Sequence, residues 1–281
     1  MSILTETYKL SNGLEIPKVG FGTWQTPDGD VAYQAVRDAL DLGYRHIDTA
    51  RVYGNEVSVG KAIKDSGLAR EEIFLTTKLP SDIKSYEGAL EYFEISRQAL
   101  AVDYFDLYLI HAPWPWSNIG ASDNAGNREA WRAFEKLYKE QKLRAIGISN
   151  FEQPDMESLL AAAEIKPMVN QIEYYVGWTE PNIVKFAEAN GILIEAYSPL
   201  ATGHMLENSA IVKLAGKYAV STAQLAIRFC LQNGVLPLPK ATSRGHIEAN
   251  AQLDFEISAE DMLTLNAMKD TAVGKHHATK G

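Results

Sequence analysis

Short apolar runs alternate with stretches of helical periodicity along most of the chain. A run of about four to eight apolar residues bounded by turn residues is typical of a buried strand, whereas apolar residues three and four apart indicate an amphipathic helix. This pattern predicts strands at 19–24, 44–50, 74–78, 105–111, 144–150, 168–174, 192–198 and 235–240. It predicts helices at 31–44, 55–67, 86–101, 128–142, 154–165, 181–191, 223–234, 247–254 and 259–270.

The alternation of strands and helices predicts a single α/β domain over residues 1–281, folded as a (β/α)8 TIM barrel. The strands are nearly continuous apolar runs, as expected of a parallel sheet that helices cover. Asn12-Gly13 lies between apolar residues in 8–17 and predicts a β-hairpin before the barrel. The segment 259–270 supplies an extra C-terminal helix.

Four polar side chains lie at or just past the carboxyl ends of predicted strands in the first half of the chain. Asp48 ends the run YRHID and is followed by Tyr53, Lys78 ends IFLTTK, and His111 ends YFDLYLIH. In a (β/α)8 barrel the carboxyl ends of the strands converge on one mouth, which carries the catalytic groups. We therefore expect a carboxylate, a phenol, an amine and an imidazole to meet at one point.

This set suits the transfer of a proton to a carbonyl oxygen while a hydride adds to the carbonyl carbon. Tyrosine is a weak acid with an ordinary pKa of about 10, and a neighbouring ammonium favours its phenolate form. We expect Lys78 to lower the pKa of Tyr53, and Asp48 to hold Lys78 by a charge-assisted hydrogen bond. His111 would donate a hydrogen bond to the substrate oxygen and orient it.

Composition and charge exclude several other classes of function. The formal net charge of −9 disfavours nucleic acid as a partner, because phosphate binding requires a basic surface. Cys230 is the only cysteine, so a disulfide framework is excluded and a buried thiol is expected. The sequence has no membrane-spanning or signal-like apolar stretch, and its histidines show no metal-ligand spacing. We expect a cytoplasmic protein without a bound metal.

From Tyr8 to Met268 the chain resembles the aldo-keto reductase family. The resemblance rests on the motifs HIDTARVYGNE, LIHAP, GISNF, NQIEY, AYSPL and LPKATSRGHIEAN. It is similar in particular to NADPH-dependent aldehyde and ketone reductases of the 2,5-diketogluconate reductase type from prokaryotes and fungi. The resemblance implies hydride transfer from a nicotinamide cofactor to a small carbonyl substrate, without metal or flavin, and we expect a monomer. It also implies that Tyr53 is the general acid, that Lys78 and Asp48 tune it, and that His111 orients the carbonyl.

The same resemblance implies a set of cofactor contacts. Ser149, Asn150 and Gln171 resemble the residues that hydrogen-bond the carboxamide of the nicotinamide, and Tyr197 resembles the ring that stacks on it. The other implied contacts are Thr23 and Asp48 beside the nicotinamide ribose, Ser198 and Leu200 beside the pyrophosphate, Lys240, Thr242 and His246 on the side of the 2′-phosphate, and Asn250 at the adenine. Barrels also commonly bind phosphate between the loops after their last two strands and a helix N-terminus.

Two positions near the implied 2′-phosphate site depart from the family pattern. Ala241 stands where the family often has serine, and His246 stands where it usually has an arginine. A neutral imidazole does not replace a bidentate guanidinium, although Arg244 could compensate in part. We therefore expect NADPH as the cofactor, bound through Lys240, with NADH as an alternative.

The substrate pocket departs from the pattern as well. Ala112 follows His111 where the family often has tryptophan, and it begins a long loop over 112–127. Such loops at an active face are usually functional. We expect Trp24, His111 and Trp114 to line an apolar pocket that accepts many carbonyl compounds. The C-terminal tail AVGKHHATKG is expected to be flexible, and the family often builds part of the pocket there.

Two other functions stay open from the sequence. One is an NADPH-binding, redox-sensing subunit of the same fold that regulates a partner protein. Very slow catalysis together with a stoichiometric partner would favour it. The other is a metal-dependent barrel hydrolase built on Asp48 and His111, for which further ligands at strand ends are missing from the sequence.

Overall fold

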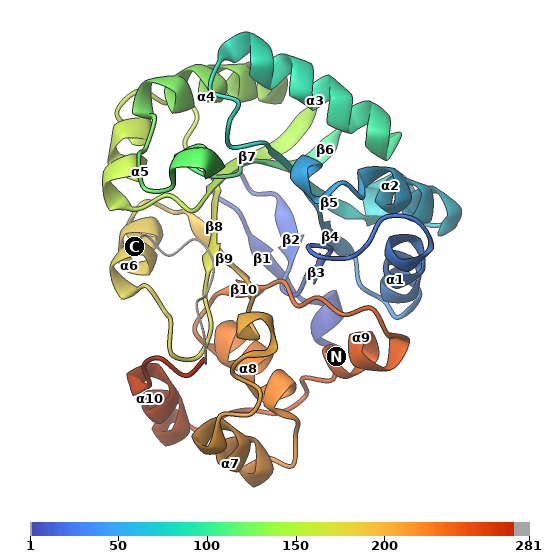
Figure 1. Ribbon diagram of the computed structural model, residues 1–281, viewed down its shortest axis with the longest axis vertical. Helices are drawn as coiled ribbons and strands as arrows, with labels where there is room; N and C mark the ends of the chain where they lie inside the picture. The colour runs from blue at the N-terminus through green and yellow to red at the C-terminus, as the bar shows by residue number, and fades with distance from the viewer. Residues whose placement is uncertain (1, 273–281) are drawn as a thin grey trace.

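The computed structural model describes residues 2–272, and it forms the predicted (β/α)8 barrel, seen in Figure 1 as a ring of helices around a curled sheet. Eight parallel strands follow one another around the sheet in chain order. They are β3 (Phe21–Gly22), β4 (His46–Asp48), β5 (Phe74–Leu79), β6 (Phe105–Ile110), β7 (Leu143–Ser149), β8 (Val169–Glu173), β9 (Leu193–Tyr197) and β10 (Leu236–Pro237). Gly20 N and Gly22 N donate to Pro237 O and Pro239 O, at 3.1 and 3.0 Å, and so join β3 to β10.

A helix is present in every predicted region, although the helix predicted at 247–254 spans Arg244–Ala249 instead, and one further helix was not predicted. The helices are α1 (Asp30–Asp41), α2 (Glu56–Asp65), α3 (Tyr86–Leu100), α4 (Asn124–Lys139), α5 (Gln153–Leu160), α6 (Pro181–Ala189), α7 (Ser209–Lys217), α8 (Thr222–Gln232), α9 (Arg244–Ala249) and α10 (Ala259–Ala267). The unpredicted helix is α7. Its buried residues Ile211 and Ala215 are four positions apart and so have helical spacing.

Side-chain caps set where several of these helices begin. Asp123 accepts a hydrogen bond from Gly126 N, and α4 therefore begins directly after Asp123. This is earlier than the predicted start at residue 128, so the long loop after β6 is shorter than expected. Ser243 caps α9 in the same way by accepting from His246 N.

The N-terminal hairpin lies at the end of the barrel away from the strand carboxyl ends. It pairs β1 (Thr7–Lys9) with β2 (Glu15–Pro17) in antiparallel fashion, as predicted. Its turn residue Asn12 donates from Nδ2 to Arg144 O at 2.9 Å, near the first residue of β7. In Figure 1 the hairpin crosses the centre of the ring. The carboxyl ends of the strands therefore remain open at the opposite end.

The core fills the barrel and the space between sheet and helices. All residues of β5 and β6 are buried, and aromatic rings such as Tyr108 and Phe134, 4.6 Å apart, stack between strand and helix. Cys230 is buried on α8, as predicted. Within residues 2–272, no helix combines the length and the apolar character that crossing a bilayer requires.

Candidate active site

The structure brings the four predicted strand-end residues together around one ammonium group. Lys78 Nζ donates to Asp48 Oδ1 at 2.7 Å, to Tyr53 OH at 3.2 Å and to Thr49 O at 2.9 Å. Lys78 is completely buried, and the rings of Tyr53 and His111 meet edge to face at 5.7 Å. Tyr53 and His111 therefore form the surface of the site, above the Lys78–Asp48 ion pair.

The turn that carries Tyr53 is fixed by the buried side chain of Asn55. Asn55 Nδ2 donates to Thr23 O and Thr26 O, at 3.0 Å each, and its Oδ1 accepts from the hydroxyl of Thr49 at 3.1 Å. These bonds tie the turn after β4 to the loop after β3. The phenol thus stands on a backbone that is held from both sides, as a positioned proton donor requires.

Burial and the Lys78–Asp48 ion pair act in opposite directions on the protonation states of the site. Lys78 lowers the pKa of Tyr53, as predicted, but burial raises it by more. The net direction of the pKa of Tyr53 is therefore upward, which the sequence did not predict. Burial alone would lower the pKa of Lys78, but Asp48 and Tyr53 together raise it. At neutral pH the pair is a protonated phenol beside a charged ammonium.

His111 is a neutral imidazole at the same mouth. Burial, and after it the charge of Lys78, holds the pKa of His111 well below its ordinary value. Asn150 Nδ2 donates to His111 O at 2.9 Å and fixes its backbone. Within the described residues, Nδ1 of His111 is buried without a hydrogen-bond partner. A neutral imidazole carries one N–H, and so it can donate one hydrogen bond to an oxygen in the cavity.

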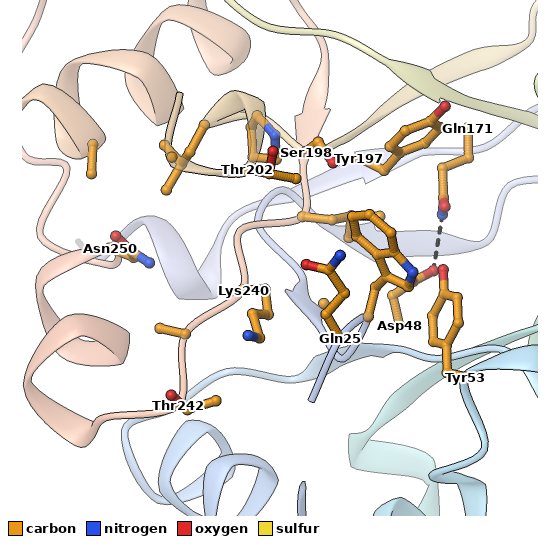
Figure 2. A pocket seen from close by; sticks show the side chains of 18 of the residues that line it. Gln25, Asp48, Tyr53, Gln171, Tyr197, Ser198, Thr202, Lys240, Thr242 and Asn250 are labelled. Carbon is orange, nitrogen blue, oxygen red and sulfur yellow. Dashed lines mark hydrogen bonds between the residues drawn. The ribbon is translucent and has the colours of Figure 1, made fainter. Parts of the chain in front are cut away.

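A cavity of about 930 Å³ runs from these residues to the loop after β10. Figure 2 shows Tyr53, Asp48 and Gln171 at one end of it and Lys240 and Thr242 at the other. The predicted cofactor residues on its wall are Ser149, Asn150, Gln171, Tyr197, Ser198, Leu200, Lys240, Thr242, His246 and Asn250. Thr23 is not on the wall. It is buried, and its hydroxyl donates to Asp48 O at 3.0 Å. Thr23 therefore fixes the backbone of Asp48 and does not face the cavity.

The hydrogen bonds at the Gln171 end leave one amide oxygen for a ligand. Gln171 Nε2 donates to Asp48 Oδ2 at 2.9 Å, drawn as a dashed line in Figure 2, and to Glu195 Oε2 at 2.8 Å. Both amide hydrogens are then used, which leaves Oε1 as an acceptor. Tyr197 OH donates to Asn150 Oδ1 at 2.8 Å and thereby fixes its ring beside the cavity. An acceptor beside a fixed aromatic ring suits a planar ligand with an N–H₂ group, such as a nicotinamide.

Glu195 is a buried acidic residue beneath the site that the sequence interpretation missed. It is completely buried on β9, and burial and then the charge of Asp48 raise its pKa to about 8. His46 Nε2 lies 4.0 Å from Glu195 Oε1, and burial lowers the pKa of His46 to about 3. Both groups are therefore neutral at pH 7. A glutamate inside the apolar run ILIEAY was the available signal, because an unpaired charge is rarely buried.

We expect the stability of this protein to fall with rising pH because of Glu195. Its pKa is about 8 when folded and about 4.5 ordinarily, so the native state retains a proton that the unfolded state releases between these values. Each pH unit in that window lowers the free energy of unfolding by up to about 1.4 kcal/mol. In the variant Glu195→Gln the side chain at this position has no titratable group. Between pH 5 and 7, urea unfolding should therefore show the wild type losing about 2–3 kcal/mol relative to the variant. Parallel pH curves would contradict this.

The other end of the cavity is lined by exposed Lys240, Thr242 and His246. Arg244, which the sequence suggested as a substitute for the missing arginine, turns away from it. Its guanidinium Nη1 donates to Asp38 at 3.1 Å and its Nη2 to Asp41, both on α1. Arg244 is therefore engaged elsewhere, and Lys240 is the cation on the cavity wall.

The wall near His111 differs from the prediction at one residue. Trp24 and His111 line the cavity as expected, but Trp114 is only 1% exposed and lies in the core. Trp116 lines the cavity instead, with its ring at 87° to that of His111 and 5.6 Å from it. Trp116 is the first residue of a 3-10 helix at Trp116–Asn118. Because both tryptophans lie in one Pro-rich loop, their sequence positions did not distinguish them.

No group of three or more His, Cys, Asp or Glu side chains that could hold a metal occurs within residues 2–272. Asp48 is engaged by Lys78 and Gln171 and so is not free as a ligand. The metal-dependent hydrolase therefore gains no support. The C-terminal tail, expected to contribute to the pocket, lies outside the described residues.

Comparison with known proteins gives consistent matches over nearly the whole chain. The model of the Aldo/keto reductase family matches residues 18–270. A glyoxal reductase of Bacillus subtilis is 44% identical over 273 residues, which are 96% of this chain and 96% of that protein. An aldo/keto reductase from Brucella melitensis, known from a crystal structure, is 40% identical in sequence and superposes with a TM-score of 0.87. The match covers 93% of this chain and 98% of that chain. An aldo-keto reductase whose crystal structure was determined in complex with NADPH is 31% identical in sequence, with a TM-score of 0.86. The match covers 95% of this chain and 88% of that chain.

Proposed function

Because the chain belongs to the aldo/keto reductase family, we propose that it reduces aldehydes and ketones to alcohols with NADPH, and that Tyr53 is the proton donor. The observation that carries the proposal is the phenol of Tyr53, 3.2 Å from a buried ammonium and beside a neutral His111 at the end of a large cavity. We further propose that the chain acts as a single domain and as a monomer.

A bound nicotinamide cofactor would supply the hydride that adds to the carbonyl carbon. The carbonyl oxygen lies between Tyr53 OH and the His111 ring, where the N–H of the imidazole fixes its direction. As negative charge develops on the oxygen, Tyr53 gives it a proton. The Lys78 ammonium, 3.2 Å from the phenol oxygen, stabilises the phenolate that remains. Asp48 keeps Lys78 in place, and solvent returns the proton to Tyr53 after the alcohol leaves.

The polar groups of the cavity fit a nicotinamide dinucleotide. Gln171 Oε1 is left to accept from the carboxamide, with Ser149 and Asn150 beside it, and the Tyr197 ring offers a face for stacking. The residues proposed for the rest of the dinucleotide are Ser198, Leu200, Lys240, Thr242, His246 and Asn250, with Asp48 at the ribose. Trp24, His111 and Trp116 are the proposed substrate contacts.

The test is a spectrophotometric assay that follows the absorbance of the reduced nicotinamide. A relative of this chain is named glyoxal reductase, so glyoxal is the first substrate, followed by benzaldehyde and a simple ketone. We expect turnover with NADPH and slower turnover with NADH. Failure of both cofactors over the whole panel would overturn the proposal. Very slow turnover together with a partner that co-purifies in stoichiometric amount would favour the regulatory subunit.

Exchanging His246 for arginine should strengthen the binding of NADPH. Lys240 is the cation on the cavity wall there, since Arg244 is bound to Asp38 and Asp41. A hydrogen bond between charged groups contributes roughly 1.5–3 kcal/mol, so we expect His246→Arg to lower the Kd of NADPH about tenfold. The Kd of NADH should stay nearly unchanged, and the gain should shrink as salt is added.

Fluorescence titration of the tryptophans with each cofactor measures both constants. His246→Gln, which adds no charge, is the control and should bind NADPH as the wild type does. Equal tightening of NADPH and NADH by arginine would show that position 246 acts on the adenine and not on the 2′-phosphate.

A further inference from the structure

One half-buried ammonium joins both ends of the loop that follows the catalytic histidine. Lys84, in the segment between β5 and α3, donates from Nζ to Ala112 O at 2.7 Å and to Asn127 Oδ1 at 2.6 Å. Ala112 directly follows His111, and Asn127 lies in the first turn of α4. The side chain of Lys84 therefore connects the two ends of this loop by hydrogen bonds.

Further hydrogen bonds hold the interior of the same loop. Asn127 is 1% exposed, and its Nδ2 donates to Pro113 O at 2.8 Å. Ser81, which is completely buried in the same segment as Lys84, accepts from Trp116 N at 3.2 Å. Gly126 allows the close approach, because a Cβ there would lie 2.5 Å from Lys84 Cβ. The segment after β5 thus holds the loop at its start, its middle and its end.

The held loop forms part of the wall of the active site. Trp116 and Ile119 line the cavity, and the Trp116 ring meets the His111 ring at 5.6 Å. Neither residue belongs to the group that transfers the proton. A substrate with a bulky substituent would meet them, whereas a very small aldehyde bound between Tyr53 and His111 would not.

Lys84 makes these bonds without a carboxylate partner. The acidic groups that act on it are Asp123, Asp82 and Asp155, and no Lys84 ion pair within 4.0 Å is found in the described residues. Burial lowers the pKa of Lys84 to about 8. A positive charge that is desolvated and bound only to neutral oxygens is costly to the fold. Its bonds to the loop offset part of that cost.

We propose that Lys84 is a positioning residue that sets substrate specificity by holding the loop with Trp116 and Ile119 against the cavity beside His111. The inference rests on the proposed function, since it concerns the substrate site of the reductase. Trp116 and Ile119 form the part of the cavity wall that a large substrate contacts. Their position then depends on Lys84, which touches neither substrate nor cofactor.

The test compares glyoxal with a bulky aromatic aldehyde, naphthaldehyde, in the wild type and in Lys84→Met. Methionine keeps an apolar stem but cannot bind Ala112 O or Asn127. We expect the KM for naphthaldehyde to change by about tenfold, the scale of one lost charge-assisted hydrogen bond. The kcat and KM for glyoxal and the Kd for NADPH should stay within about twofold of the wild type. Lys61→Met, which removes an exposed ion pair with Asp65 on α2, is the matched control and should change neither substrate.

An equal loss with both substrates would overturn the proposal, since a general structural defect would affect both. Unchanged constants for naphthaldehyde would overturn it too. Where Lys84→Met does not fold, Ser81→Ala releases Trp116 N alone. Its KM for naphthaldehyde should then change by a smaller factor, while its constants for glyoxal stay the same.

In the wild type, the ratio between the KM values for the two aldehydes should also change as pH rises through about 8, because Lys84 loses its charge there. If the wild type turns over no aldehyde at all, the proposed function fails first, and the two failures are distinguished.

Discussion

Replacing Tyr53 by phenylalanine is expected to lower kcat by about two to four orders of magnitude, the usual scale of general acid catalysis. The substitution removes only the hydroxyl, which lies 3.2 Å from Lys78 Nζ, and leaves the ring that meets His111. The Lys78–Asp48 pair, at 2.7 Å, does not depend on the phenol. Hydride transfer would then have to proceed without a positioned proton for the oxygen.

Steady-state rates with glyoxal and NADPH measure the effect, and tryptophan fluorescence gives the Kd of NADPH, which should change little. Tyr33→Phe is the matched control, because that hydroxyl bonds Asp65 at the surface, at 3.1 Å. A Tyr53→Phe enzyme that keeps most of its rate would mean that another group donates the proton. His111 would then be the next candidate.

The sequence predicted those parts of the molecule that depend on local pattern and on the symmetry of the fold. Counting apolar runs predicted eight strands, and the barrel then required their carboxyl ends to meet. The convergence of Asp48, Tyr53, Lys78 and His111 followed from that rule, since they lie at the same end of three neighbouring strands, β4, β5 and β6.

The predictions that failed depend on the directions of individual side chains. Trp114 and Trp116 are two residues apart, and their sequence positions do not show that Trp114 is buried while Trp116 lines the cavity. Arg244 has the right charge near the expected 2′-phosphate site, but Asp38 and Asp41 lie on α1, far away in the sequence, and bind it. Such competition between partners is set by tertiary packing and leaves no periodic signal.

Protonation states were likewise beyond the sequence. The expected effect of Lys78 on Tyr53 was correct in sign as a pairwise interaction, but burial outweighs it. The degree of burial is a property of the closed barrel. The same applies to Glu195, whose neutral form at pH 7 follows from its position below Gln171 and Asp48.

Replacing Lys78 by methionine should damage both stability and catalysis, because it removes one partner of a fully buried ion pair. Asp48 would keep only its bond from Gln171, and breaking a buried pair in this way typically costs about 3–5 kcal/mol. The pKa of Tyr53 would rise further, since Lys78 is the group that lowers it. We expect a fall in kcat of about a hundredfold or more.

The double variant Asp48→Asn with Lys78→Met separates these two effects. Without either charge, no uncompensated ion is left in the core, so most of the lost free energy of unfolding should return. Activity should not return, because the phenolate of Tyr53 would still lack its neighbouring cation. The comparison needs the free energy of unfolding in urea and the kcat of four proteins. These are the wild type, Asp48→Asn, Lys78→Met and the double variant. Recovery of activity together with stability would show that Lys78 serves the fold alone and does not act on Tyr53.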